Sequence, residues 1–341
     1  MRESGHRLIP VWVWALLSLA VVSITLFLFF TDRRPEPGPA LIYDISEYEA
    51  VDKSRVIYAE VRRIPVNLRN PAGLVVAGEG NLLVAGDTAL IVLDPSGGEI
   101  TRRDLDVSPQ CVAAGSDGII YLGVGDHVAM LPSLESMPVP WAPLGEQSWL
   151  TSITVNERFV YAADSGNARI LQYDRSGKLL REIGGKNDLE NPRRFIVPSP
   201  YFDMAIDGLD MLWSVNPGRL GVENYREDGT LASAWHQPGM GLESFSGCCN
   251  PAHIAFKRNN VLVTAEKGIN RVKTYGADHS FLGVVATPEL LNAGWSPSGE
   301  TYELAPVRDL AVDDRDRILV LHGPLHCILV FEESPHQKES P

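Results

Sequence analysis

The stretch Arg158-Phe-Val-Tyr-Ala-Ala-Asp-Ser-Gly-Asn-Ala-Arg-Ile-Leu-Gln-Tyr-Asp174 decides the fold of this chain. Two short runs rich in Val, Ala, Ile and Tyr flank a turn of Asp, Ser, Gly and Asn, which predicts a pair of strands joined by a hairpin. A strand-like run precedes them at Leu150–Val155, and another follows the Asp174 turn at Ser176–Ile183. The unit therefore has four short strands.

This four-strand unit recurs along the chain. Units begin near Asn70, Ser108, Leu150, Phe202, Phe245 and Val307. Four strands at a period of roughly 40–55 residues are typical of propeller blades. The sequence therefore predicts an all-β, six-bladed β-propeller over residues 55–331.

The sixth unit lacks a fourth strand, because the chain turns polar after Phe331. The run Arg55–Val61 is a spare strand that precedes the first unit. We expect it to complete the last blade and close the ring, which removes the exposed strand edges of an open sheet.

Residues Ala163-Asp-Ser-Gly-Asn-Ala-Arg-Ile-Leu-Gln-Tyr-Asp-Arg-Ser-Gly177 resemble the NHL repeat, and Glu266–Tyr275 and the sixth unit resemble it more loosely. The fifth unit is also similar to that of bacterial membrane-anchored NHL-repeat proteins without an assigned activity. The resemblance covers about residues 65–331 and implies a six-bladed propeller of the NHL/YWTD type. It implies no particular reaction, because such propellers include scaffolds, binders, lyases and hydrolases.

The N-terminal region has the pattern of a membrane anchor. After a short tail at residues 1–8, residues 9–30 carry no charge, and about 20 apolar residues span a bilayer core of roughly 30 Å. A cleaved signal peptide is the alternative, but the run ends Leu26-Phe-Leu-Phe-Phe30 without a small-residue cleavage site. We expect an uncleaved transmembrane signal-anchor, a linker at 31–54 and a disordered tail at 332–341.

The sequence indicates the orientation of this anchor less clearly than it indicates the anchor itself. Arg2 and Arg7 lie on one side and Arg33 and Arg34 on the other, so the positive-inside rule is nearly balanced. Because short N-terminal anchors commonly deliver the following domain outward, we expect a single-pass membrane protein with its propeller on the extracytoplasmic, periplasmic side.

The overall charge argues against one class of partner. The 341 residues carry a formal net charge of -13, and nucleic-acid binding requires a basic patch. We expect no nucleic-acid partner, and instead a protein or small-molecule ligand.

One position in each blade, just before the apolar run of the inner strand, is a candidate site. It is occupied by Gly73, Cys111, Ser152, Asp203, His253 and Asp309. Inner strands surround the central channel, so these side chains are expected to ring its mouth. Cysteine, histidine and aspartate are metal-ligand types, and a divalent ion such as Zn, Fe or Ca is the candidate cofactor. The alternative is that the polar residues only line a wet channel.

Cys248 and Cys249 are the second candidate. Adjacent Cα atoms lie about 3.8 Å apart, whereas ordinary disulfides place them about 4.4–6.8 Å apart. A vicinal disulfide would therefore be strained and easily reduced, which suits a redox switch. The alternatives are a bond to Cys327 or Cys111, a metal or reactive thiol, and two small structural side chains.

The third candidate is a run of charge in the fifth unit, formed by Glu266, Lys267, Arg271 and Lys273. These residues are candidates for a ligand-binding patch on the channel face. The alternative is that they bond the turn and the neighbouring blade.

No G-x-S-x-G, Walker, H-E-x-x-H or dinucleotide motif is present in the sequence. The leading hypothesis is therefore a membrane-anchored propeller that acts as a binding scaffold and not as an enzyme. The rival is a metal-dependent lyase or hydrolase, or a thiol-redox protein, with its site at the channel mouth.

Overall fold

The computed structural model describes residues 10–31, 45–186, 194–293 and 305–334. The chain divides into two compact units, Met1–Ile45 and Ser46–Pro341.

Among its described residues, the first unit contains one helix, α1 (Val11–Thr31). Over the part of the chain that the structure describes, no helix meets the length and apolarity needed to cross a membrane. The anchor predicted for residues 9–30 therefore stays a prediction.

The second unit contains six four-stranded antiparallel sheets. The first three are β2 (Pro71–Val76), β3 (Leu82–Gly86), β4 (Ala89–Leu93) and β5 (Glu99–Asp104); β6 (Cys111–Ala114), β7 (Ile120–Val124), β8 (His127–Leu131) and β9 (Val139–Pro140); and β10 (Leu150–Val155), β11 (Phe159–Asp164), β12 (Arg169–Asp174) and β13 (Leu179–Gly184). The others are β14 (Met204–Ile206), β15 (Leu212–Asn216), β16 (Gly221–Tyr225) and β17 (Leu231–His236); β18 (His253–Phe256), β19 (Leu262–Glu266), β20 (Arg271–Tyr275) and β21 (Phe281–Ala286); and β22 (Val307–Val312), β23 (Ile318–His322), β24 (Cys327–Glu333) and β1 (Tyr58–Pro65). The predicted six-bladed propeller is confirmed.

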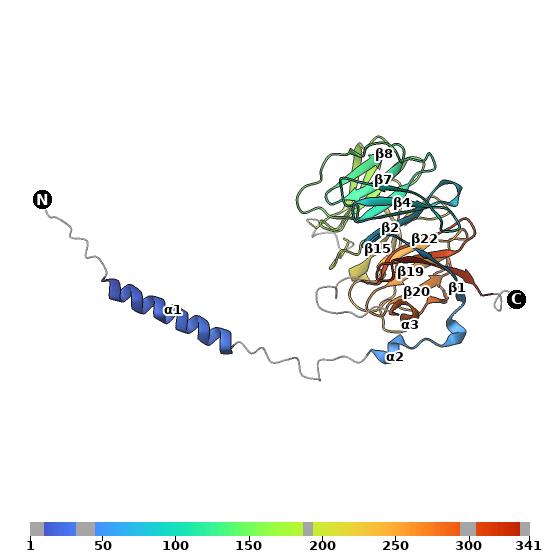
Figure 1. Ribbon diagram of the computed structural model, residues 1–341. Coiled ribbons are helices and arrows are strands. Elements are labelled where there is room, and N and C mark those ends of the chain that lie inside the picture. The colour runs from blue at the N-terminus through green and yellow to red at the C-terminus, as the bar shows by residue number, and fades with distance from the viewer. Residues whose placement is uncertain (1–9, 32–44, 187–193, 294–304, 335–341) are drawn as a thin grey trace. The chain divides into compact units, whose positions relative to one another are not determined.

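The last blade is closed by a strand from the start of the unit. Its order is β1-β24-β23-β22, and Tyr58 pairs with Glu333 while Pro65 pairs with Cys327. Figure 1 shows β1 beside the C-terminal strand. The closing strand lies a few residues downstream of the predicted Arg55–Val61, and β24 extends two residues past the predicted end at Phe331.

Short helices occupy part of the predicted linker. These are α2 (Ser46–Glu49) and a 3-10 turn at Lys53–Arg55, while residues 32–44 and 335–341 lie outside the described residues. A further short helix, α3 (Pro288–Leu291), follows the fifth blade.

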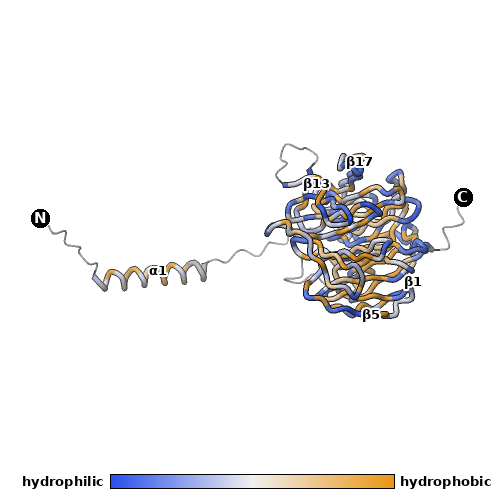
Figure 2. The backbone as a smooth tube through the Cα atoms, turned by 90° about the horizontal axis from the view of Figure 1, so that it is seen from above, coloured by the Kyte–Doolittle hydropathy of each residue, from blue (hydrophilic) through white to orange (hydrophobic). Residues whose placement is uncertain are grey.

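The burial pattern explains why the strands pack in blades. The second and third strands are sandwiched between neighbouring blades, and β3 and β4 are buried along their whole length. The fourth strand is mostly exposed, as β5 and β13 show. Figure 2 places β1, β5, β13 and β17 at the periphery of the propeller.

A recurring turn precedes four of the outer strands. In each, an aspartate carboxylate accepts a hydrogen bond from the backbone N–H two residues later, and these bonds help to lower the pKa of each aspartate. The aspartates are Asp94, Asp174, Asp228 and Asp278, with N···O distances of 2.7, 2.9, 2.9 and 3.0 Å. This Asx turn is the physical basis of the repeated Asp-Gly signal in the sequence.

Candidate functional site

The inner strands enclose a cavity of about 300 Å³ on the central axis. The six positions singled out from the sequence share one register. Each lies opposite the second-to-last residue of its neighbouring strand, in the pairs Gly73–Ala85, Cys111–Gly123, Ser152–Ala163, His253–Ala265 and Asp309–Leu321, while the Asp203 carbonyl accepts a hydrogen bond from the Val215 amide. In three blades a β-bulge directly precedes the ring residue, a device that aims a side chain.

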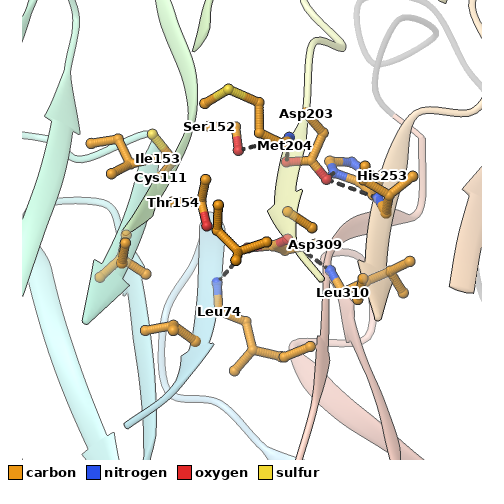
Figure 3. A pocket seen from close by; sticks show the side chains of 18 of the residues that line it. Leu74, Cys111, Ser152, Ile153, Thr154, Asp203, Met204, His253, Asp309 and Leu310 are labelled. Atoms are coloured by element: carbon orange, nitrogen blue, oxygen red, sulfur yellow. Dashed lines mark hydrogen bonds and ion pairs between the residues drawn. The ribbon is translucent and has the colours of Figure 1, made fainter. Parts of the chain in front are cut away.

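Three of these side chains, from consecutive blades, converge. One ligand atom each from Asp203, His253 and Asp309 lies within 4.8 Å of the other two. Figure 3 shows Asp203 and His253 side by side among the residues that line the cavity, with Asp309 near them. The His253 Nδ1 atom lies 3.7 Å from Asp203 Oδ2.

The same carboxylates join neighbouring blades. Asp203 Oδ2 accepts a hydrogen bond from the Ile254 amide at 2.9 Å, and Asp309 Oδ2 accepts one from the Leu74 amide at 2.7 Å. The Ser152 hydroxyl oxygen accepts one from the Met204 amide at 3.2 Å. In all three cases a ring side chain binds the amide that follows the ring residue of the next blade.

These bonds leave acceptor capacity on the carboxylates. The second oxygen of Asp203 accepts from Met204 N at 2.8 Å, and that of Asp309 from Leu310 N at 2.7 Å. Since each carboxylate oxygen has two lone pairs, every oxygen keeps one available to a cation or a substrate.

His253 has a buried ring nitrogen without a hydrogen-bond partner among the described residues. This atom is Nε2, and buried polar groups are mostly paired. The edge of the ring packs against Tyr201, with centroids 5.9 Å apart. A nitrogen in this state is available to a ligand.

The pKa of the Asp309 carboxyl group is raised well above its ordinary value. Burial and the nearby Asp203 charge raise the pKa of Asp309 to about 7. Two carboxylates close together in one cavity repel each other unless a proton or a cation is shared between them. Asp309 can therefore exchange a proton near neutral pH.

The three side chains must close inward to hold a divalent cation. Ligands at about 2.1 Å around a tetrahedral zinc are roughly 3.4 Å apart, so a separation of up to 4.8 Å requires closure by about 1.4 Å. Calcium bonds are longer, but calcium prefers oxygen ligands. The imidazole therefore favours zinc or iron over calcium.

Cys111 lines the cavity but lies outside the group of converging ligand atoms found among the described residues. It is buried in an apolar cluster with Tyr121 and Ile153, and burial raises its pKa. Its sulfur packs so closely on Gly123 that a Cβ there would lie 2.3 Å away. Of the four predicted ligand residues, the structure therefore brings together Asp203, His253 and Asp309 but not Cys111.

The four cysteines are free thiols in the structure. Cys248 and Cys249 lie with their sulfur atoms 3.2 Å apart. Neither is bonded to Cys111 or Cys327, and Cys327 is buried in the core of the last blade. The predicted alternative of a disulfide to either distant cysteine is therefore not realised.

Three members of the predicted binding patch are interior. Glu266, Arg271 and Lys273 are each at most 1% exposed, and Glu266 pairs with Arg271 at 2.7 Å and with Lys273 at 3.2 Å. Lys273 also donates to the Leu242 and Ser244 carbonyls of the preceding loop, and burial lowers its pKa to about 8. This trio joins a blade to its neighbouring loop and presents no surface to a ligand.

Lys267 differs from these three. Its ammonium group donates to the Ser199 hydroxyl at 3.1 Å and lies 4.5 Å above the Tyr201 ring centre. Since Tyr201 contacts His253, Lys267 belongs to the surroundings of the candidate site.

The sequence comparison of blades did not identify Arg308 or Tyr201. Arg308 lines the cavity beside Asp309, and its side chain makes no hydrogen bond or ion pair with the described residues. Burial lowers its pKa. Its only sequence signal is its place directly before a ring residue.

Comparison with known proteins supports the fold of this chain and nothing beyond it. No family model matches the chain, and no curated protein matches it in sequence. Similar solved structures include a streptogramin B lyase (TM-score 0.57, 12% identity, 83% of this chain and 100% of that chain) and a gluconolactonase from Xanthomonas campestris (0.57, 11%, 81% and 99%). A catalytically inactive virginiamycin B lyase from Staphylococcus aureus with quinupristin is also similar (0.51, 14%, 83% and 90%). These neighbours establish a six-bladed propeller, and membership of the NHL-repeat family stays a prediction.

The buried trio leads to a stability prediction. Changing Glu266→Gln leaves two buried cations without their counter-ion, so we expect a loss of about 3–5 kcal/mol in the free energy of unfolding. The matched control is Glu182→Gln, which removes the half-exposed partner of Arg169 and should cost less than about 1 kcal/mol. Denaturant unfolding measures both, and equal effects would show that the trio contributes no more than a surface pair.

The raised pKa of Asp309 leads to a pH prediction. Because its folded pKa lies above its ordinary value, its stabilising contribution is complete below about pH 4 and is lost as pH rises through about 7. In chelator, the unfolding free energy of Asp309→Asn should therefore gain on that of the wild type as pH rises over this range. The lost acceptor oxygen adds a constant offset, so the slope is the readout, and a flat difference would contradict the assignment.

Proposed function

We propose that this protein is a metal-dependent lyase or hydrolase whose site is the cavity at the channel mouth. The observation that carries the proposal is the convergence of two carboxylates and an imidazole within 4.8 Å, together with the buried, unpartnered Nε2 of His253. A purely structural ring would satisfy this nitrogen with a hydrogen bond.

The roles of the chain's own residues follow from their surroundings. Asp203, His253 and Asp309 would hold a divalent ion, which supplies a Lewis acid for a carbonyl or ester oxygen. Asp203 is fixed by two backbone amides, so it contributes a rigid ligand. Arg308, beside them, is suited to an anionic group of the substrate.

The size of the cavity limits the substrate. A volume of about 300 Å³ is at the lower end of the range of small-molecule pockets, so the reacting group must be small. Enzymes with this fold include the streptogramin B lyase and the gluconolactonase above, which supports the reaction class by analogy of fold alone.

Metal analysis of the purified full-length protein tests the proposal. With the exposed Cys248 thiol alkylated, we expect one divalent ion per chain and a rise in thermal stability, since an ion at a hundred times its Kd stabilises by about 2.7 kcal/mol. His253→Ala and Asp203→Ala should lose both effects. The control is His236→Ala, whose side chain pairs with Glu223 and does not line the cavity.

Absence of metal and of any thermal shift with zinc, iron, manganese or calcium would overturn the enzyme proposal. The scaffold hypothesis, in which the propeller binds a protein or small ligand without reaction, would then stand.

We also propose that the N-terminal unit tethers the propeller to a membrane with the propeller on the extracytoplasmic side. The charge-free run at residues 9–30 supports this. Alkaline carbonate extraction should leave the full-length chain in the membrane pellet and release residues 46–341. Release of the full-length chain would refute the tether.

A further inference from the structure

Cys248 and Cys249 form a second site, separate from the three channel ligands. Their sulfur atoms lie 3.2 Å apart, Cys248 is exposed, and Cys249 is buried. A thiol pair at this separation shares a hydrogen between its sulfurs, and a cation bound by both sulfurs would replace that hydrogen.

The loop that carries the pair is fixed from both sides. The buried Asn250 side chain donates to the Ser246 carbonyl at 2.7 Å and to the Lys267 carbonyl at 3.0 Å, and it accepts from the Lys267 amide at 2.9 Å. Gly247 has φ of 76°, a conformation that favours glycine. These contacts tie the thiol loop to the turn between β19 and β20.

The separation of the sulfurs distinguishes chelation from disulfide formation. A disulfide requires about 2.05 Å between sulfurs, which is more than 1 Å shorter than the distance in the structure. Bonds of about 2.3 Å from each sulfur to a tetrahedral ion place the sulfurs roughly 3.8 Å apart, so the pair must open by about 0.6 Å from its separation of 3.2 Å. This movement is about half of the one that a disulfide requires.

Polar groups surround the buried thiol. The Ser199 hydroxyl hydrogen-bonds the Cys249 sulfur. Ser199 in turn accepts a hydrogen bond from Lys267. Exposure of Cys248 leaves a path for the ion and room for water to complete its coordination.

We propose that Cys248 and Cys249 chelate one soft divalent cation of the zinc and cadmium class at the surface beside the channel mouth. Two thiols bind the ion through two sulfur–metal bonds and release two protons, so the step involves no oxidation or reduction. Contact from Cys249 through Ser199, Lys267 and Tyr201 to His253 places this soft site next to the harder carboxylate–imidazole site.

Cadmium titration of the reduced full-length protein tests the site, because cadmium thiolates absorb in the ultraviolet and carboxylate or imidazole sites do not. We expect the absorption to saturate at one cadmium per chain. Cys248→Ser and Cys249→Ser should each weaken cadmium binding by at least about tenfold in chelator competition. The matched controls are Cys111→Ser and Cys327→Ser, which remove the two buried thiols and should leave the absorption unchanged.

His253→Ala separates this site from the proposed channel metal, since it should keep the thiolate absorption. Cys248 is exposed, so its serine variant decides the question even if Cys249→Ser misfolds. Three outcomes would overturn the proposal: no absorption in the wild type, absorption that survives Cys248→Ser, or absorption that is lost in Cys111→Ser. So would two missing thiols after treatment with reductant, because the pair would then be locked as a disulfide.

Discussion

The antiparallel pairing of β1 with β24 is the interaction on which the rest of the structure depends. It makes the last blade a composite of the two ends of the propeller chain and covers the edge of β24. The ring positions of the blades can surround one axis only when the circle is complete. The convergence of Asp203, His253 and Asp309 is thus a product of closure as much as of the three residues themselves.

The ring side chains serve the architecture and the site together. Asp203 and Asp309 each accept an amide of the next blade, so they would be retained in a propeller with no chemistry at all. His253 breaks this scheme, because its buried Nε2 has no partner. This nitrogen favours a functional ring over a structural one, as does the pKa of about 7 that burial and the nearby Asp203 charge give Asp309.

Much of the fold could be predicted from local signals. Strand runs, Asx turns such as that at Asp174 and the missing fourth strand of the last unit are encoded within a few residues of each other, and the blade register followed from aligning them. The ring position was found in the same way. What failed depends on how side chains pack. The sequence does not show that Cys111 turns against Gly123 of its own blade. Nor does it show that Glu266, Arg271 and Lys273 face the preceding loop and not a ligand. A charge run is equally compatible with a solvated face and with a buried network, and only the packing decides.

The composite blade also constrains how the chain can fold during synthesis. Tyr58 and Glu333, which pair across the closure, are 275 residues apart in sequence. Contacts of such long range form slowly because the intervening chain must first be ordered. During synthesis β1 leaves the ribosome or the translocation channel long before β24. Five blades can therefore form while the ring is still open, and the last blade is completed only when the end of the chain has been made. Any nascent propeller of this kind therefore passes through a stage in which its first strand is unpaired, and protection of that strand is a requirement of its biogenesis.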